Sequence, residues 1–345
     1  MATYLNYPFD SEVFISTWQE TPDPIKSAMV ESGAMVEDAL IKAQIQNDGY
    51  LYSIPFYDVL SGTPTNYDGA TDIETTGTTA GVQTGVVFGR SIGFTAKNFV
   101  SELSGSDPMG HIAGTVGKFW AKQRQNILLG ILNAIFGISG GATTPAGKWA
   151  SGHTADLGSK TATPYLIGAT DLNTLATQAL GDNKNKFSIA VMHSNVAKTL
   201  ENLQALDFWK YTDANGIQRP LGLASANGFT VIIDDSVPAT KVGGSGENKD
   251  LYSYTTYLLG EGAIRTAPAK LDVPCEVDRD PKTNGGEDTL YTRIRETIHP
   301  NGFSFTPPAQ GFTNSPTDAQ LCDSANWSIK FDPKAIPIAR LITNG

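Results

Sequence analysis

Charged side chains are scarce in this sequence, at 17% of its 345 residues, against roughly 25% in an average soluble protein. They are also unbalanced, because 35 Asp and Glu outnumber 25 Lys and Arg and give a formal net charge of −10. An acidic surface is repelled by phosphates, which excludes tight nucleic acid binding by the whole surface but leaves a local basic patch open. Apolar residues still reach 40%, which argues against an intrinsically disordered chain.

Cysteine and long apolar runs are also nearly absent. Cys275 and Cys322 are the two cysteines, too few for a disulfide framework in a chain of this length, so we expect reduced thiols. The longest apolar stretch, 127–138, is too short to span a bilayer. The first residues show no secretory signal. We therefore expect no membrane partner.

The patterns that carry chemistry are missing as well. His111, His153, His193 and His299 are not three or four residues from one another or from a cysteine, so zinc spacing is absent. The acidic stretch around Lys282 fits a calcium loop only in part, because a lysine stands at a ligand position. No phosphate-binding loop, dinucleotide fingerprint or nucleophile elbow is present. We expect no cofactor, no metal and no enzymatic activity.

Two adjacent carboxylates, Asp234 and Asp235, end the apolar stretch GFTVIIDDSVP. Neighbouring side chains on a strand point to opposite faces, so we expect these two to diverge and not to share a proton or an ion. If the strand ends in a turn, both could instead accept hydrogen bonds from backbone N–H groups. The sequence therefore favours a structural role for this strand end.

A long helix over 107–137 is the clearest element present. Asp107 can cap it, Pro108 suits its first turn, and Gly137 is placed to end it. Apolar residues recur through it at helical spacing. At a rise of about 1.5 Å per residue it would form a rod of roughly 43 Å, which is long for a globular domain.

Three glycines lie in the first part of this helix. Gly110, Gly114 and Gly117 are spaced four and three apart and so share one face. Each costs about 1 kcal/mol relative to alanine in a helix interior. A bend, or the close approach of another backbone, would account for them. The alternative is a helix that begins later, near Lys118.

Residues 50–95 predict a long two-stranded arm. YLYSIPFYDVL is strand-like, the next stretch is rich in glycine, threonine and aspartate, and VVFGRSIGFTA looks like a returning strand. A lone hairpin is marginal in water, so this arm should be ordered only when it lies on something else. A flexible surface loop is the alternative.

The rest of the chain predicts a mixed α/β block followed by strands. Residues 138–164 look like a small-residue connection. In the block, helices are expected over 170–180 and 195–203, and strands over 187–194, 228–238 and 254–265. Two strands then flank PKTNGGED, a short helix follows Pro316, and AIPIARLITNG is a last strand.

Several stretches, taken in order, carry a resemblance. They are IPFYDVLSGTPTNYDGATDI, GRSIGFTAKNFVSELSGSDPMGHIAGTVGKFWAKQRQ, IAVMHSNVAKTLENL, GFTVIIDDSVP, RETIHPNGFSF and ANWSIKFDPKAIPIARLITNG. Together they resemble the major capsid proteins of tailed bacteriophages, which share the Hong Kong 97-type fold. No single motif is very specific, but their order runs over nearly the whole chain. The resemblance implies an α+β fold and a structural protein, not an enzyme.

The resemblance also implies a division of the chain. The amino-terminal arm would span 1–48, and an extended β-hairpin loop at 49–98 would lie over a neighbouring subunit. A peripheral domain would span 99–164, with a spine helix at 107–137. An axial α/β domain at 165–270 would cluster around pentamer and hexamer centres, and a segment at 271–345 would return strands to the peripheral domain.

A protein of this kind would self-assemble, as hexamers and pentamers of itself, into the icosahedral shell of a virion. The shell would be assembled in the host cytoplasm and would enclose double-stranded DNA without sequence-specific binding. A portal would be a partner, with scaffolding or decoration proteins as further candidates. We expect the loop to contact neighbouring subunits through Phe56, Tyr57, Asn66, Tyr67, Asp68, Thr75, Thr76 and Arg90.

Two departures from the family stand out. The sequence shows no long scaffolding segment before the arm, so we expect scaffolding, where it is needed, to come from another protein or to have been removed. The lysine–asparagine pair that crosslinks subunits in the type member has no recognisable counterpart, so covalent crosslinking is not predicted.

Three other functions remain as alternatives. An encapsulin-like nanocompartment shares the fold and would carry cargo peptides on its inner wall. A cytosolic hydrolase would need a deep pocket that holds two carboxylates from Asp234, Asp278, Asp280 and Glu296. A tail or baseplate structural protein is the third.

The glycine stripe generates a prediction about maturation, which the family resemblance implies. As a hypothesis, Gly110, Gly114 and Gly117 are where the spine helix bends when the shell expands. Replacing all three by alanine should block or distort expansion. Electron microscopy of shells before and after expansion is triggered measures the effect. Normal expansion of the triple variant would refute the hypothesis.

Overall fold

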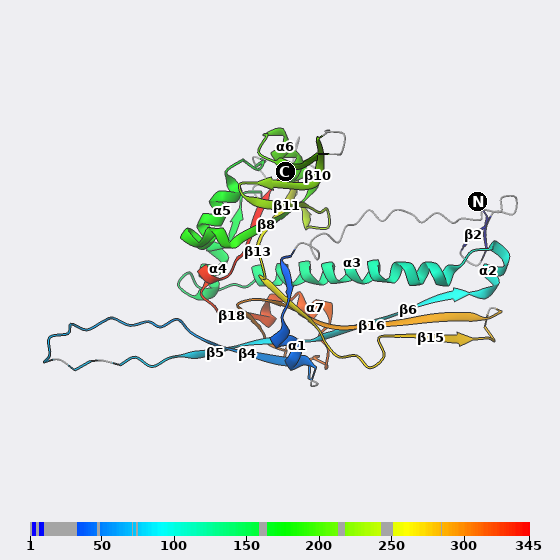
Figure 1. The fold of residues 1–345 in the computed structure, drawn as a ribbon, viewed down its shortest axis with the longest axis horizontal. Helices are drawn as coiled ribbons and strands as arrows, with labels where there is room; N and C mark the ends of the chain where they lie inside the picture. The colour runs from blue at the N-terminus through cyan, green and yellow to red at the C-terminus, as the bar shows by residue number, and fades with distance from the viewer. Residues whose placement is uncertain are drawn as a thin grey trace.

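The computed structural model describes residues 2–4, 7–9, 33–46, 49–70, 72–73, 75–158, 164–212, 218–242, 251–283 and 285–345. It combines an α/β body, a long helix that runs beside extended strands, and an arm that projects to one side (Figure 1). At the amino terminus, β1 (Ala2–Tyr4) pairs antiparallel with β2 (Tyr7–Phe9). Residues 10–32, which belong to the expected amino-terminal arm, lie outside the described residues.

The body contains a mixed sheet in the order β7-β19-β13-β8-β11-β10-β9, with β12 also paired to β13. Its strands are β7 (Thr154–Asp156), β8 (Phe187–Met192), β9 (Asp207–Thr212), β10 (Gln218–Ala226), β11 (Phe229–Ile233), β12 (Ala239–Lys241), β13 (Tyr252–Gly260) and β19 (Ile338–Thr343). Beside it lie α5 (Asp171–Leu180), the short 3₁₀ helix η1 (Gly181–Lys186) and α6 (Ser194–Asn202).

The central strands of this sheet are buried on both faces. In β8, Ala190 and Met192 join the core under α5 and α6, whereas Ile189 and Val191 join the core on the side of the long helix. Alternate residues of a strand point to opposite faces, so a strand between two cores must be apolar at every position. This is why the stretch FSIAVM contains almost no polar residue.

A second sheet has the order β15-β16-β14-β3, with β6 paired to β16. Its strands are β3 (Met35–Glu37), β6 (Phe88–Lys97), β14 (Ile264–Pro268), β15 (Cys275–Asp280) and β16 (Glu287–Pro300). The small elements around it are α1 (Ala39–Ile45), α2 (Asn98–Ser104), β17 (Phe303–Phe305), α7 (Asp318–Leu321), η3 (Ser324–Asn326), β18 (Trp327–Ile329) and η4 (Pro333–Ala335).

The long helix α3 spans Pro108–Phe136, and Asp107 caps it by accepting a hydrogen bond from Gly110 N. The alternative start near Lys118 is therefore wrong. Its fully buried residues begin only at Gln125, so the first half is at most partly covered. Gly114 and Gly117 face open space, where an added Cβ would meet no atom within 4 Å. No backbone among the described residues explains these two glycines.

The arm is a hairpin of β4 (Leu51–Tyr57) and β5 (Ala80–Val86), which pair antiparallel with each other. The returning strand is thus Ala80–Val86, whereas Phe88–Lys97, expected in the arm, pairs with β16 in the second sheet. Gly81 lies opposite Phe56 and Gly85 opposite Tyr52. An added Cβ at either glycine would come within about 2.4 Å of the facing ring. Aromatic rings laid over cross-strand glycines allow this glycine-rich strand to pair.

Further differences concern the borders of the α/β block. The stretch 254–265 is not one strand, because β13 ends at Gly260, Gly262 turns with φ 66°, and β14 begins in the second sheet. The last strand, β19, pairs with β13 inside the first sheet. The expected connection at 138–164 contains α4 (Pro145–Gly152), capped by Thr144 and anchored by the buried Trp149.

The exposed glycines of α3 lead to a stability prediction. The double substitution Gly114→Ala and Gly117→Ala should raise the free energy of unfolding by up to about 2 kcal/mol, since each glycine costs about 1 kcal/mol in a helix interior. Chemical denaturation followed by circular dichroism measures the change. Gly110→Ala is the control, because its methyl group would meet the capping carboxylate of Asp107 and should bring no such gain. A less stable double variant would contradict this account.

Candidate assembly surfaces

The outer part of the arm exposes apolar side chains that nothing in the described chain covers. Residues 58–79 continue beyond β4 and β5 without a described helix or strand (Figure 1). The exposed fractions of Val59, Tyr67 and Tyr57 are 92%, 87% and 81%, and Leu60 and Ile73 are similarly open. A cluster of large exposed apolar groups on an extended segment is typical of a protein interaction surface.

The predicted contact residues of the loop separate into two groups. Tyr57, Asn66, Tyr67, Asp68, Thr75 and Thr76 are exposed on the arm. Phe56 instead packs edge-to-face on Phe331, with ring centroids 4.8 Å apart. Arg90 lies on β6, where its Nε donates to Asp318 Oδ1 at 3.0 Å. Phe56 and Arg90 therefore stabilise this chain internally.

The root of the arm, where β4 and β5 meet β16, is held by buried polar contacts. Tyr52 Oη lies 2.9 Å from Thr297 Oγ1, which donates to the Val86 carbonyl at 2.8 Å. Gln83 Oε1 lies 3.2 Å from His299 Nε2. Sequence reasoning missed these residues. The signal for them was the alternation of polar residues in RIRETIHP, which places Arg295, Thr297 and His299 on one face of β16.

Two consecutive residues of α3 fasten it to both sheets. Arg124 Nε donates to the carboxylate oxygens of Glu296 on β16 at 3.1 and 2.8 Å. Gln125 Nε2 donates to Asp234 Oδ2 at 2.9 Å and to Ser236 Oγ, just beyond β11. Both carboxylates are buried. Removing Arg124 would leave the buried carboxylate of Glu296 without its ion pair, which is destabilising.

Asp234 and Asp235 point apart in the structure. Asp234 is 1% exposed and also accepts a hydrogen bond from Ser236 N at 3.0 Å. Asp235 is exposed and accepts one from Ser194 N, at the start of α6, at 2.9 Å. One carboxylate thus links the first sheet to α3, and the other links it to α6.

The acids considered for hydrolysis are not gathered in a pocket. Asp234 and Glu296 are bound by different residues of α3, and Asp278 and Asp280 lie on the exposed strand β15. Asp280 accepts hydrogen bonds from Thr283 Oγ1 and Lys282 N, which lower the pKa of its carboxyl. That is the behaviour of a turn residue. Among the described residues, no group of three His, Cys, Asp or Glu could hold a metal ion.

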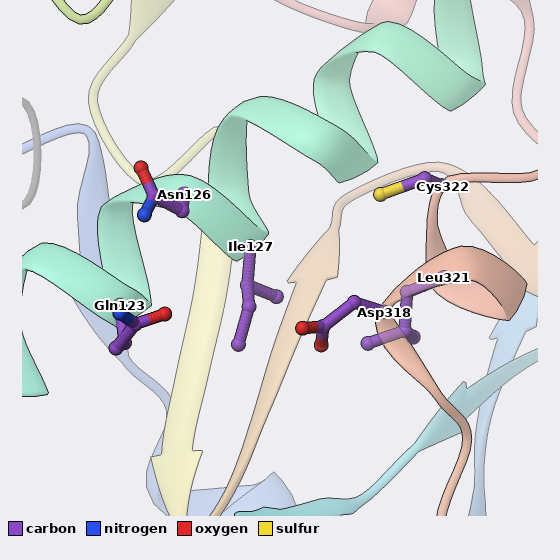
Figure 2. Close-up of a pocket in the computed structure, with 6 residues that line it drawn as sticks. All are labelled: Gln123, Asn126, Ile127, Asp318, Leu321 and Cys322. Carbon is purple, nitrogen blue, oxygen red and sulfur yellow. The ribbon is translucent and has the colours of Figure 1, made fainter.

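A small cavity of about 120 Å³ lies between α3 and α7 (Figure 2). Its lining residues are Gln123, Asn126, Ile127, Asp318, Leu321 and Cys322. Partial burial, and next the charge of Asp318, raise the pKa of the Cys322 thiol. A thiol held in its protonated form is a poor nucleophile. Asp318 itself is bound by Arg90.

None of the helices in the described ranges combines the length and the apolar composition needed to cross a bilayer.

Comparison with known proteins gives one curated relative and many similar structures. No protein-family model matches the sequence. The chain is 28% identical to the major capsid protein of Bacillus phage SPP1 over 316 residues, which are 91% of this chain and 90% of that protein.

Solved phage capsids have the same fold. The capsid of Ralstonia phage GP4 matches with a TM-score of 0.59 at 14% identity, covering 100% of this chain and 98% of that chain. The capsid of cyanophage Pam1 matches with a TM-score of 0.61 at 10% identity, covering 97% of this chain and 96% of that chain. At such low identities the similarity establishes the fold alone. The α+β fold expected from the sequence is confirmed.

The two neighbouring aspartates provide a matched pair of substitutions. Asp234→Ala should lower the free energy of unfolding by about 3 kcal/mol, because the amide of Gln125 loses its buried, charged acceptor. Asp235→Ala should cost about 1 kcal/mol or less, since it removes one exposed hydrogen bond at a helix start. Urea denaturation of both variants measures the difference. Equal losses would contradict the assignment of Asp234 as the link to α3.

Proposed function

We propose that this chain, which is a major capsid protein of a tailed bacteriophage with the Hong Kong 97-type fold, builds its shell by laying the β4–β5 arm over neighbouring copies. The product is an icosahedral shell around double-stranded DNA, and the protein is a component of the virion. The exposed apolar surface of the arm, from Tyr57 to Ile73, is the observation that carries the proposal.

The contact is formed by copies of the same chain. Each arm covers its apolar side chains on a neighbour, and each body provides a surface for another arm. Asp58, Asp68 and Asp72 lie on the outer arm, and no lysine or arginine occurs from 49 to 89. The receiving surface is therefore expected to carry positive charge, because like charges placed opposite each other are unfavourable.

The proposed roles of the segments follow the division of the chain that the family resemblance implies. Residues 1–48 act as an amino-terminal arm and 49–86 as the extended loop, because β6 belongs to the second sheet. Residues 99–164 form the peripheral domain, and 165–270 the axial domain at the centres of hexamers and pentamers. Residues 271–345 return to the peripheral part, although β19 pairs within the first sheet and so also supports the axial domain.

Other partners belong to the same proposal. The shell is assembled in the host cytoplasm around a portal, with scaffolding or decoration proteins as additional components. The wall encloses DNA without sequence-specific contacts, which agrees with a net charge of −10.

The arm can be tested by removing its apolar contacts. The double substitution Leu60→Ser and Tyr67→Ser should leave the fold intact, since both side chains are exposed, but should prevent closed shells. Burial of one such side chain contributes about 2 kcal/mol, so losing one weakens a contact by roughly 30-fold. Sedimentation velocity and electron microscopy measure the fraction of chains in shells, and circular dichroism checks the fold.

Leu203→Ser is the control, because Leu203 is an exposed leucine at the end of α6, away from the arm. This variant should assemble as the unsubstituted protein does. Normal shells from the Leu60 and Tyr67 double variant would contradict the intersubunit role of the arm.

A further inference from the structure

The root of the arm is attached to β16 and β17 by hydrogen bonds as well as by apolar packing. Arg295 donates to the Gly49 carbonyl at 2.7 Å, Thr297 to Val86, and Ser304 Oγ accepts from Thr84 N at 2.8 Å. A small cluster that includes Ile41, Ile45, Tyr52 and Val87 adds apolar burial there, and Val86 of β5 joins the main core.

His299 is the titratable imidazole of this row. Its side chain is 1% exposed, and its Nε2 lies 3.2 Å from Gln83 Oε1. The same oxygen accepts a hydrogen bond from Gly302 N at 3.2 Å. Gln83 Oε1 is therefore an acceptor, and His299 Nε2 must carry the proton. The other ring nitrogen, Nδ1, is buried without a hydrogen-bond partner.

The charges around His299 do not favour a second proton on its ring. Arg265 on β14 lies directly opposite His299 in the sheet register. Its guanidinium donates to Asp38 at 3.0 Å, so that carboxylate is already paired. On β4, the ring of Tyr52 lies edge-on to the imidazole, with the ring centroids 6.1 Å apart. From β5, the facing group is the neutral amide of Gln83.

We propose that His299 is a proton-operated latch for the arm: a neutral His299 fits the closed root between β5 and β16, and uptake of a proton at Nδ1 places an unpaired buried charge beside Arg265, which opens the root although the Nε2 donor to Gln83 is retained. The proton comes from solvent, and no covalent bond changes. The latch acts on the arm whose intersubunit role is proposed above. Opening of the root does not depend on that role, but the effect of opening on the shell does.

The direction of the pH effect follows from the site. Burial, and next the charge of Arg265, lower the pKa of His299 to about 4, from an ordinary value of 6.5. An opened root exposes the ring and restores its ordinary pKa, so the open state binds the proton more tightly. The closed state is fully favoured above pH 6.5, and this preference is lost as the pH falls toward 4. Over that window the opening equilibrium should rise roughly 80-fold, toward a limit of about 300-fold at still lower pH.

Hydrogen–deuterium exchange of the unassembled, full-length chain tests the latch. The readout is protection of residues 80–86 between pH 7 and pH 4, corrected for the intrinsic pH dependence of exchange. The unsubstituted chain should lose protection there in acid. His299→Gln keeps a neutral donor for Gln83 but cannot titrate, so its protection should change little over the same range.

His153 supplies the matched control. It is also buried, with a pKa lowered to about 4, but it lies at α4 and β19, where its Nδ1 contacts the Ile338 carbonyl. His153→Gln should leave the acid response of residues 80–86 unchanged. If His299→Gln does not fold, Gln83→Glu replaces it, because a carboxylate beside the protonated ring should suppress acid opening.

The latch is refuted if the unsubstituted chain keeps its protection at pH 4, or if His299→Gln or a folded Gln83→Glu opens in acid as the unsubstituted chain does. These outcomes are independent of the intersubunit role, because the root is measured before any shell forms. Failure of the Leu60 and Tyr67 test would remove that role and leave the latch standing.

Discussion

A two-stranded hairpin has no second layer of its own, and the rest of the structure depends on this constraint. The backbone groups of β4 and β5 that face each other are paired, but the side chains beyond Tyr57 have no described surface to pack against. Ordering an extended segment costs conformational entropy, which only burial can offset. In the proposed function the arm is stabilised by association, which would link the order of the arm to the stability of the assembly.

The strand β16 connects this arm to the rigid part of the chain. One face presents Glu296 and Ile298 to α3 and the main core, and the other presents Thr297 and His299 to the arm root. The same helix is tied through Gln125 to the end of β11. A load on the arm thus passes through one strand to a helix that is fixed to both sheets.

The sequence predicts the elements well where the local signal and the environment agree. Asp107, Pro108 and Gly137 mark the ends of α3 because capping is a local interaction. The sequence analysis places the returning strand of the arm too late in the chain. The glycine-rich strand β5 carries little strand signal of its own, because its glycines are covered by the rings of Tyr52 and Phe56 on β4. The root was missed because hydrogen bonds such as Gln83 to His299 join residues far apart in the chain. A single sequence cannot reveal such pairs, and it also does not show that Arg90 is used internally.

The two kinds of attachment in this chain have different mechanical consequences. Apolar burial is non-directional, so the core around Leu128 and Ile135 is held by close packing and not by fixed bond angles. Hydrogen bonds weaken steeply when they are misaligned, so the root at Tyr52 and Gln83 permits few orientations of the arm. A change in arm angle must then proceed by breaking the whole polar set, not by gradual sliding. The proposed latch would therefore act on the orientation of the arm as a unit.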